Sequence, residues 1–216
     1  KTLSAGIIAI VIIFQPELRR ALEELGKKNV AFKLLKIGNN IDDESLSDQS
    51  VEEIIRATLE MAKVKTGALI VVARDHDLSQ YSETGIKVGA KITSQLLINI
   101  FEKNTPLHDG AVIIEGNKIV SATCYLPLSD SVSLSKELGT RHRAGLGISE
   151  VTDSIVIIVS EENGSVSIAR DGQLIRYADT AILKNELVKA QAKAEVKPKK
   201  RFWKGRERNE KSNDEN

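Results

Sequence analysis

The sequence contains only one cysteine, Cys124, among its 216 residues. A single thiol cannot form an internal disulfide, and it cannot supply the several thiolates that most structural zinc sites use. Disulfide-stapled secreted domains are therefore excluded. The composition fits a reducing compartment, and we expect the cytosol.

Aromatic residues are also scarce, at 4% of the chain, although 41% of the residues are hydrophobic. This hydrophobic content is sufficient for the core of one sizeable domain. Because that core must be mainly aliphatic, an aromatic residue inside an aliphatic stretch is a candidate ligand contact. Tyr125, in the stretch CYLPLS, is such a residue.

The chain has almost no net charge, at +1, but its charges are uneven. The segment from residue 196 onward carries eight Lys or Arg against four Asp or Glu, which leaves the body mildly acidic. A nucleic-acid groove needs a basic face, so we expect no nucleic-acid partner, although a few arginines could hold a small anion. The basic tail could contact lipid headgroups, but a solvated disordered tail is favoured.

No hydrophobic run reaches the ~20 residues that a membrane-spanning helix needs. Residues 3–14 form an apolar run of about twelve residues, followed by a proline and basic side chains. Arginines at the end of a hydrophobic helix are typical of the cytoplasmic side. We interpret 3–14 as the end of a transmembrane helix rather than as a soluble amphipathic helix, and no signal-peptide cleavage site follows it.

Hydrophobic periodicity predicts an α/β (α+β) fold, in which helices flank a mixed central β-sheet. The predicted elements are helices at 50–67, 93–104 and 179–194, a buried strand at 68–73, and hairpins at 111–127 and 154–170. The first helix carries a predicted capping box of Ser50 and Glu53, and it is predicted to stop at Gly67.

Two nucleotide-binding fingerprints are missing. The sequence has no GxxxxGK[ST] phosphate loop, and AGLGISE places Glu150 where a dinucleotide fingerprint has its third glycine. The pairs His76-Asp77 and His108-Asp109 suggest a metal phosphohydrolase. That class is disfavoured because the chain has only three histidines.

The stretch GTRHRAGLGISE, at 139–150, groups two arginines at a predicted helix start. With Thr140 as N-cap and Arg141 opening the helix, the first-turn amides and the guanidiniums of Arg141 and Arg143 would converge on one anion, such as a polyphosphate. Spacing alone slightly favours another reading, in which both arginines are solvated surface charges.

The stretch TPLHDGAVII, at 105–114, places His108 and Asp109 before a glycine and an apolar run. Local sequence favours a turn into a strand. In the alternative, Asp109 binds a divalent metal or accepts a proton from a sugar hydroxyl, while Gly110 lets the ligand approach the backbone.

Taken together, DGA at 109–111 and RHR at 141–143 resemble the two signature motifs of the diadenylate cyclase (DAC) domain family. The stretches LHDGAVII, CYLPLS, LGTRHRAGLGISE and IVIIVSEENGSVSIARDG are similar to the membrane-anchored bacterial branch, called the CdaA type. VIIFQPELRRALEELG resembles the end of that branch's last transmembrane helix. The resemblance covers residues 3 to about 190.

The resemblance implies the DAC fold and the condensation of two ATP molecules into cyclic di-AMP, with release of two pyrophosphates. Each ribose 3′-hydroxyl attacks the α-phosphate of the partner ATP in line, across a face-to-face homodimer. A divalent metal is the implied cofactor: Mn²⁺ or Mg²⁺, with Co²⁺ as a third candidate.

The resemblance also assigns roles to residues. It implies that Asp109, Arg141 and Arg143 are catalytic, and that His108 and Asp109 contact the metal. The implied nucleotide-binding residues are Gly110, Ala111, Tyr125, Leu126, Thr140, Arg141, His142, Arg143, Ser160 and Glu161. Other readings stay open: a hydrogen-bonded turn for His108, core packing for Tyr125, and a plain strand exit for Ser160 and Glu161.

The implied location is the cell membrane, with a cytoplasmic catalytic domain. The expected organisation is a transmembrane end and juxtamembrane helix at 1–26, a linker at 27–48, the catalytic domain at 49–193 and a basic disordered tail at 194–216. Implied partners beyond substrate and product are a membrane-side regulatory protein and the cytosolic phosphoglucosamine mutase. The alternatives are a membrane-tethered scaffold and an inactive adenine-nucleotide sensor, which would have no chemical need for Asp109.

Overall fold

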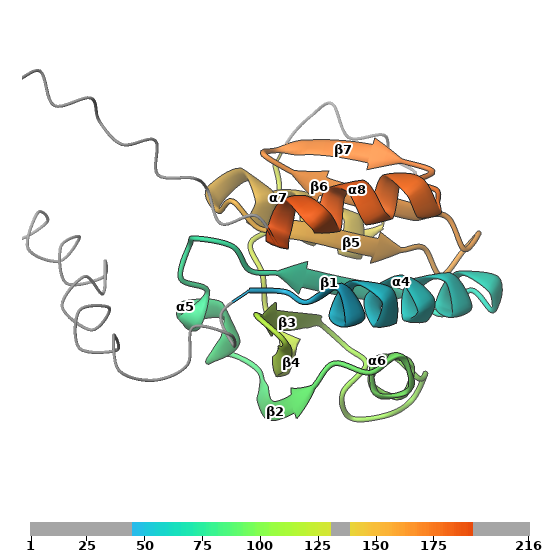
Figure 1. Cartoon of the computed structure of the whole chain (residues 1–216), viewed down its shortest axis with the longest axis horizontal. Helices are drawn as coiled ribbons and strands as arrows, with labels where there is room; N and C mark the ends of the chain where they lie inside the picture. The colour runs from blue at the N-terminus through green and yellow to red at the C-terminus, as the bar shows by residue number, and fades with distance from the viewer. Residues whose placement is uncertain (1–44, 131–138, 192–216) are drawn as a thin grey trace, which may run out of the picture. The chain divides into compact units, whose positions relative to one another are not determined.

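A single mixed sheet of seven strands runs in the order β2-β4-β3-β1-β5-β6-β7 (Figure 1). The computed structural model describes residues 45–130 and 139–191, which belong to the compact unit Glu44–Asn216. The strands are Ala68–Val72 (β1), Ile86–Lys91 (β2), Ala111–Glu115 (β3), Lys118–Cys124 (β4), Ile155–Val159 (β5), Val166–Arg170 (β6) and Gln173–Arg176 (β7). Strands β1 and β3 pair in parallel, and the other neighbouring pairs are antiparallel. The predicted mixed sheet with flanking helices is confirmed.

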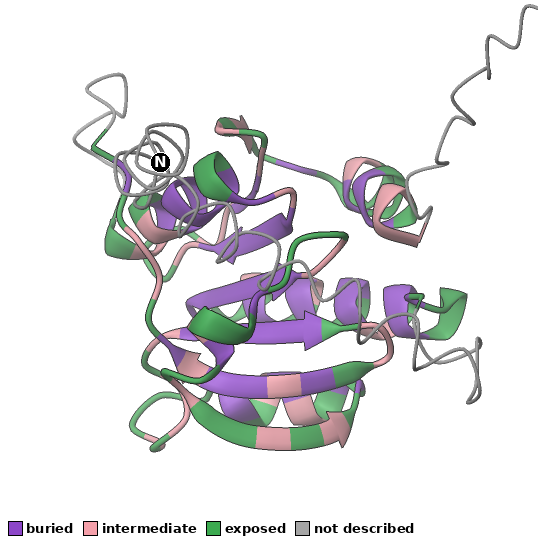
Figure 2. Ribbon diagram, turned by 90° about the vertical axis from the view of Figure 1, so that its left-hand side faces the viewer, coloured by how far each residue is buried: buried purple, intermediate pink, exposed green. Residues whose placement is uncertain are grey.

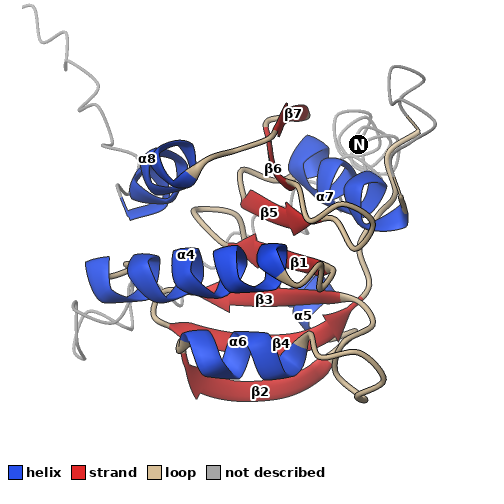
Figure 3. Ribbon diagram, turned by 90° about the vertical axis from the view of Figure 1, so that its right-hand side faces the viewer, coloured by secondary structure: helices blue, strands red, loops and turns tan. Residues whose placement is uncertain are grey.

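Helices cover both faces of this sheet. They are α4 (Asp48–Lys63), α5 (Ser79–Ser82), α6 (Ser94–Ile100), α7 (Thr140–Val151) and α8 (Thr180–Gln191). Alternate strand residues point to opposite faces, so Ile70 joins the hydrophobic cluster under α4, α6 and α8, whereas Leu69 joins the cluster under α7. Figure 3 shows α4 beside α6 on one face.

Strand β1 is buried along its whole length between β3 and β5, as its unbroken apolar run predicted. The edge strand β2 instead alternates between exposed and half-buried residues (Figure 2). Strands β2 and β7 and the short helix α5 were not predicted from the sequence. Their short polar stretches contain no apolar run, and β2 also carries a register shift between Lys87 and Ala90.

The N-terminus of α4 corrects the predicted capping box. The N-cap is Ser47, whose hydroxyl accepts a hydrogen bond from the Ser50 amide at 3.2 Å. The Ser50 hydroxyl donates to the Asn117 side chain at 2.8 Å, in the β3–β4 turn. The Glu53 carboxylate accepts from the Ser94 amide at 2.6 Å and so joins α4 to α6. The box was predicted wrongly because Ser47 and Ser50 give the same local signal.

The predicted stop at Gly67 was also wrong. Helix α4 ends at Lys63, and the left-handed residue that follows is Lys65, with a φ of 56°. Gly67 serves a close approach instead, because a Cβ there would lie 2.6 Å from Arg141 Nη1.

The two predicted hairpins are confirmed as β3–β4 and β5–β6, with left-handed glycines at Gly116 (φ 54°) and Gly164 (φ 76°) in their turns. The helix predicted at 93–104 is shorter than expected, at Ser94–Ile100 with Thr93 as its N-cap. The last predicted helix is α8.

The predicted transmembrane end at 3–14 and the basic tail from 194 lie outside the described residues. None of the helices in 45–130 and 139–191 has the length and apolarity needed to cross a bilayer.

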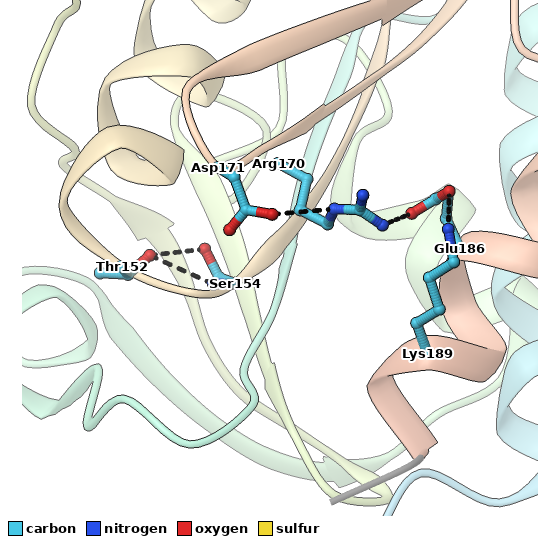
Figure 4. Close-up of polar contacts among 6 residues, drawn as sticks. All are labelled: Thr152, Ser154, Arg170, Asp171, Glu186 and Lys189. Carbon is cyan, nitrogen blue, oxygen red and sulfur yellow. Dashed lines mark hydrogen bonds and ion pairs between the residues drawn. The ribbon is translucent and has the colours of Figure 1, made fainter. Parts of the chain in front are cut away.

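Helix α8 is attached to β6 by a buried carboxylate (Figure 4). The Glu186 side chain, 7% exposed, accepts from both Arg170 and Lys189. We expect Glu186→Gln to lower the free energy of unfolding by about 1–3 kcal/mol, because Lys189 loses its charged partner and Arg170 keeps only Asp171, while both cations stay partly hydrated. Urea denaturation measures the change.

The matched control is Glu60→Gln, which removes an exposed ion pair with Lys63 on α4. This variant should change the free energy of unfolding by less than about 0.5 kcal/mol. Equal losses in the two variants would show that the buried pair does not fix α8.

Candidate active site

A sharp turn before β3 presents His108 and Asp109. Gly110 has a φ of 125°, and a Cβ there would lie 2.7 Å from the main-chain carbon of Thr123, so only glycine fits. The Thr123 hydroxyl donates to the Leu107 carbonyl at 3.2 Å, which fixes the turn against β4. Asp109 is exposed and His108 is half-buried. The stretch is thus a turn into a strand, as local sequence favoured.

The hydrogen bond of His108 defines its tautomer. Its Nδ1 lies 2.6 Å from the carbonyl oxygen of Thr105. A carbonyl can only accept, so Nδ1 carries the hydrogen and the neutral ring keeps its lone pair on Nε2. His108 is therefore a hydrogen-bonded turn residue whose other nitrogen has the form that a metal ligand requires.

The first turn of α7 brings Arg141 to the same region. The N-cap is Gly139, without a side-chain cap, so the predicted N-cap Thr140 is instead the first helical residue. Arg141 Nη1 contacts Glu161 Oε2 at 2.7 Å, and the guanidinium packs over Gly67. A cavity of about 230 Å³ is lined by Gly67, Phe101, Lys103, Asn104, His108, Arg141 and Glu161. Three of the predicted site residues thus meet at one cavity.

His142, between the two arginines, is buried and lines a second cavity with Ser160. Burial, and then the positive charge of Arg176, lower the pKa of His142, while Glu162 acts in the opposite direction. The lowered pKa means that His142 is neutral at pH 7. It therefore contributes hydrogen bonding rather than charge.

Arg143 turns away from Arg141. Its Nε and Nη2 lie 3.3 and 3.2 Å from the Ser129 carbonyl oxygen, and the Ser129 amide donates to the Arg143 carbonyl at 3.0 Å. Arg143 thus holds the segment 125–130 against α7, and the predicted convergence of both guanidiniums on one point is wrong for this conformation.

Tyr125, at the start of this segment, is 73% exposed, which rules out the core-packing alternative for its ring. Its amide donates to the Thr84 hydroxyl at 2.9 Å. Leu126 is half-buried and packs on the smaller hydrophobic cluster. The main chain is therefore anchored on both sides while the aromatic ring stays free to meet a ligand.

Ser160 and Glu161 follow β5 directly. The Ser160 amide donates to Ser165 O at 2.9 Å, and its hydroxyl accepts from the Glu162 amide at 3.3 Å. They form a plain strand exit, as the simpler reading held. They also line the two cavities, so the simpler reading does not exclude a role in binding.

The competing metal phosphohydrolase reading is not supported. His76 pairs with Asp153 at 3.4 Å and follows the carboxyl end of β1, whereas His108 precedes the amino end of the parallel strand β3. The two His-Asp pairs therefore lie at opposite ends of the sheet. Within the described part of the chain, no three His, Cys, Asp or Glu side chains gather as a metal site.

Several residues around the cavities were not predicted as site residues from the sequence: Gly67, Lys103, Asn104, Arg176 and Tyr177. Asparagine often adopts a positive φ, as Asn104 does (63°), but the positive φ of Tyr177 (57°) has no clear sequence signal. The glycine at position 67 could have indicated a close approach of another group, but a glycine there also fits the end of a helix.

Comparison with known proteins identifies the family. A family model described as DisA bacterial checkpoint controller nucleotide-binding (DAC) matches residues 55–174. A protein of Listeria monocytogenes named diadenylate cyclase is 56% identical over 205 residues, covering 94% of this chain and 73% of the relative. The cyclic di-AMP synthase CdaA of Bacillus subtilis is 50% identical over 204 residues, covering 93% and 72%.

Solved structures agree with these matches. A crystal structure of a double mutant of DacA from Staphylococcus aureus has a TM-score of 0.66 and 47% identity, covering 67% of this chain and 96% of that chain. A structure described as a hypothetical membrane spanning protein from Bacillus cereus has a TM-score of 0.60 and 34% identity, covering 82% and 87%. The chain therefore belongs to the DAC family, whose closely similar members are named diadenylate cyclases.

Proposed function

We propose that this chain is a diadenylate cyclase that condenses two ATP molecules into cyclic di-AMP and releases two pyrophosphates. Relatives at 56% and 50% identity carry this activity in their names. The observation that carries the proposal is a single cavity lined by His108, Arg141 and Glu161. Asp109 directly follows His108 in the sequence. An inactive sensor would not need the Asp109 carboxylate near Arg141, the cation that binds phosphate.

Asp109 acts on the nucleophile. Its exposed carboxylate accepts the hydrogen of the ribose 3′-hydroxyl as the oxygen attacks the α-phosphate of the other ATP. The new O3′–P bond forms while the bond to the bridging oxygen of the pyrophosphate breaks. The partly exposed main chain of Gly110 can meet the ribose and the α-phosphate, whereas the buried Ala111 fixes the turn to β3.

A divalent metal fits the donors of this turn. His108 Nε2 and the Asp109 carboxylate would hold it, and the ion would neutralise phosphate charge when bound. A nitrogen and an oxygen donor together suit Mn²⁺ and Co²⁺ at least as well as Mg²⁺. With two protein donors, the remaining coordination positions are left to phosphate oxygens and water.

The phosphates bind at the start of α7 and the end of β5. Arg141 exchanges its ion pair with Glu161 for phosphate oxygens, and Thr140, His142 and Ser160 add polar contacts. Arg143 supports the adenine side through the Ser129 carbonyl. There the Tyr125 ring stacks on the base, and Leu126 offers its main chain.

Two protomers are needed because one site that holds one ATP cannot close a symmetric cyclic dinucleotide. We expect specific activity to fall in proportion to protein concentration below the dimer dissociation constant, since the active species is then second order in protein. A dilution series at saturating ATP and metal measures this. Specific activity that stays constant down to concentrations at which sedimentation shows only monomer would contradict the two-protomer mechanism.

The activity itself is tested by incubating the chain with ATP and Mg²⁺ or Mn²⁺, with mass detection of cyclic di-AMP. No product with either metal at high protein concentration would favour the sensor of the same fold.

Membrane attachment is part of the proposal, supported by the Bacillus cereus structure described as membrane spanning. The cytoplasmic location, the domain boundaries, the membrane-side regulator and the phosphoglucosamine mutase partner stay predictions.

A further inference from the structure

A second cavity, also of about 230 Å³, lies at the same edge of the sheet as the first. The first cavity includes Arg141 and Glu161, and the second includes the next residue along α7, His142, and the residue before Glu161, Ser160. Gly67 and His108 precede the parallel strands β1 and β3, Glu161 and Ser160 follow β5, Ser165 precedes β6 and Arg176 ends β7. The strand registers place all of these positions along one edge of the sheet, and so the two cavities follow each other along that edge. A triphosphate held by Arg141 can therefore extend into the second cavity.

Arg176 brings a positive charge to this second cavity. Its guanidinium carbon lies 5.3 Å from the centre of the Tyr177 ring, and its Nη2 lies 3.5 Å from the Tyr177 hydroxyl. In the regions 45–130 and 139–191, no carboxylate forms an ion pair with Arg176, whereas Arg141 pairs with one carboxylate and Arg170 with two. The guanidinium is thus oriented by an aromatic ring but keeps its charge uncompensated, as an anion-binding arginine requires.

The backbone at Tyr177, which lines this cavity, is strained. Tyr177 has a φ of 57°, a left-handed conformation that is sterically unfavourable for a bulky residue, and its side chain is not held by burial, since the residue is 66% exposed. Strained residues of this kind concentrate at ligand sites. The turn after β7 therefore has the features of a binding segment rather than of a simple connection.

The other lining groups select the kind of anion. The second cavity contains one carboxylate, from Glu162, together with neutral His142 and the polar side chains of Ser160, Asn163 and Ser165. A bare anion would be repelled by Glu162. A magnesium-chelated diphosphate matches both charges, because its oxygens suit Arg176 and its hydrated cation suits Glu162.

We infer that the second cavity receives the β- and γ-phosphates of ATP, the diphosphate that leaves in the reaction, and that Arg176 is the residue that recognises them. This inference rests on the proposed function and extends it to a residue outside the two family motifs. Cyclic di-AMP has no such phosphates, so its affinity should not depend on Arg176.

The test compares Arg176→Gln with the matched control Arg56→Gln, an exposed arginine on α4. Calorimetry gives the dissociation constants for magnesium pyrophosphate and for cyclic di-AMP, without turnover. We expect Arg176→Gln to weaken pyrophosphate binding about tenfold, the loss of one charge-assisted contact, and to change cyclic di-AMP binding less than about twofold. Arg176→Lys should lie between, and Arg56→Gln should match the unaltered chain.

Unchanged pyrophosphate binding in Arg176→Gln, or an equal loss for both ligands, would overturn the inference. The second outcome would indicate a general structural role. If pyrophosphate binding depends on Arg176 but the unaltered chain forms no cyclic dinucleotide, the proposed activity fails while the diphosphate site stands.

Discussion

Asp109→Asn should reduce kcat for cyclic di-AMP formation by about 10³-fold, within the range expected for the loss of a general base. The amide keeps the shape of the side chain but can neither accept the 3′-hydroxyl proton nor carry charge toward a metal. Because Asp109 is exposed and precedes β3 in a turn fixed by Gly110 and Thr123, the fold should be unaffected. Initial rates at saturating ATP and metal measure the loss.

The matched control is Asp75→Asn, an exposed aspartate that follows β1 at the opposite end of the sheet. Its rate should stay within about twofold of the unaltered chain, since surface changes away from special features have small effects. Equal melting temperatures for both variants would exclude misfolding as the cause. If Asp109→Asn kept a tenth or more of kcat, Asp109 would not be the proton acceptor.

Gly147→Ala should lower the free energy of unfolding by about 3 kcal/mol, at the upper end of the range for overpacking. A Cβ at Gly147 would lie 2.2 Å from the Pro127 carbonyl oxygen and 2.7 Å from the Ser129 amide nitrogen. Both are main-chain atoms, which cannot move aside by a side-chain rotation. The segment 125–130 must therefore shift away from α7, and since it carries Tyr125, the KM for ATP should rise as well. Urea denaturation and substrate titration measure the two effects.

Gly139→Ala, at the N-cap of the same helix, is the control. A Cβ at Gly139 would meet nothing within 4 Å, and its φ of −67° suits any residue. Exchanging an N-cap glycine for alanine costs about 1 kcal/mol or less. If the two alanines were equally destabilising, the contact between α7 and the segment 125–130 would not explain the effect.

The interior strands of the sheet could be predicted from the sequence, and the two edge strands could not. Strand β1 was predicted because burial on both faces leaves an unbroken aliphatic run. The hairpins β3–β4 and β5–β6 were predicted from their turn residues, Gly116 with Asn117 and Asn163 with Gly164. The edge strands β2 and β7 are half-exposed, so their sequences resemble loops. The cap of α4 was misplaced because only tertiary contacts, those of Glu53 with Ser94 and of Ser50 with Asn117, distinguish two equivalent serines.

Some residues of the candidate site could also be predicted from the sequence, and others could not. His108 and Arg141 could be selected because they belong to motifs, and the structure brings them to one cavity from elements far apart in the sequence. The divergence of Arg141 and Arg143 follows from their two-residue spacing inside a helix. Convergence was predicted instead because Thr140 suits an N-cap, whereas α7 already begins at Thr140. Arg176 belongs to no motif and gains its position from a strand that the sequence did not reveal.

The ion pair between Arg141 and Glu161 has a consequence for ligand discrimination. Before a nucleotide arrives, the guanidinium already has an anionic partner within the protein. A monophosphate offers little more than the carboxylate it must displace. A metal-bound triphosphate can replace the Glu161 carboxylate at Arg141, and its cation can then pair with the carboxylate that is released. The internal ion pair therefore selects against the small anions that are abundant in a cell.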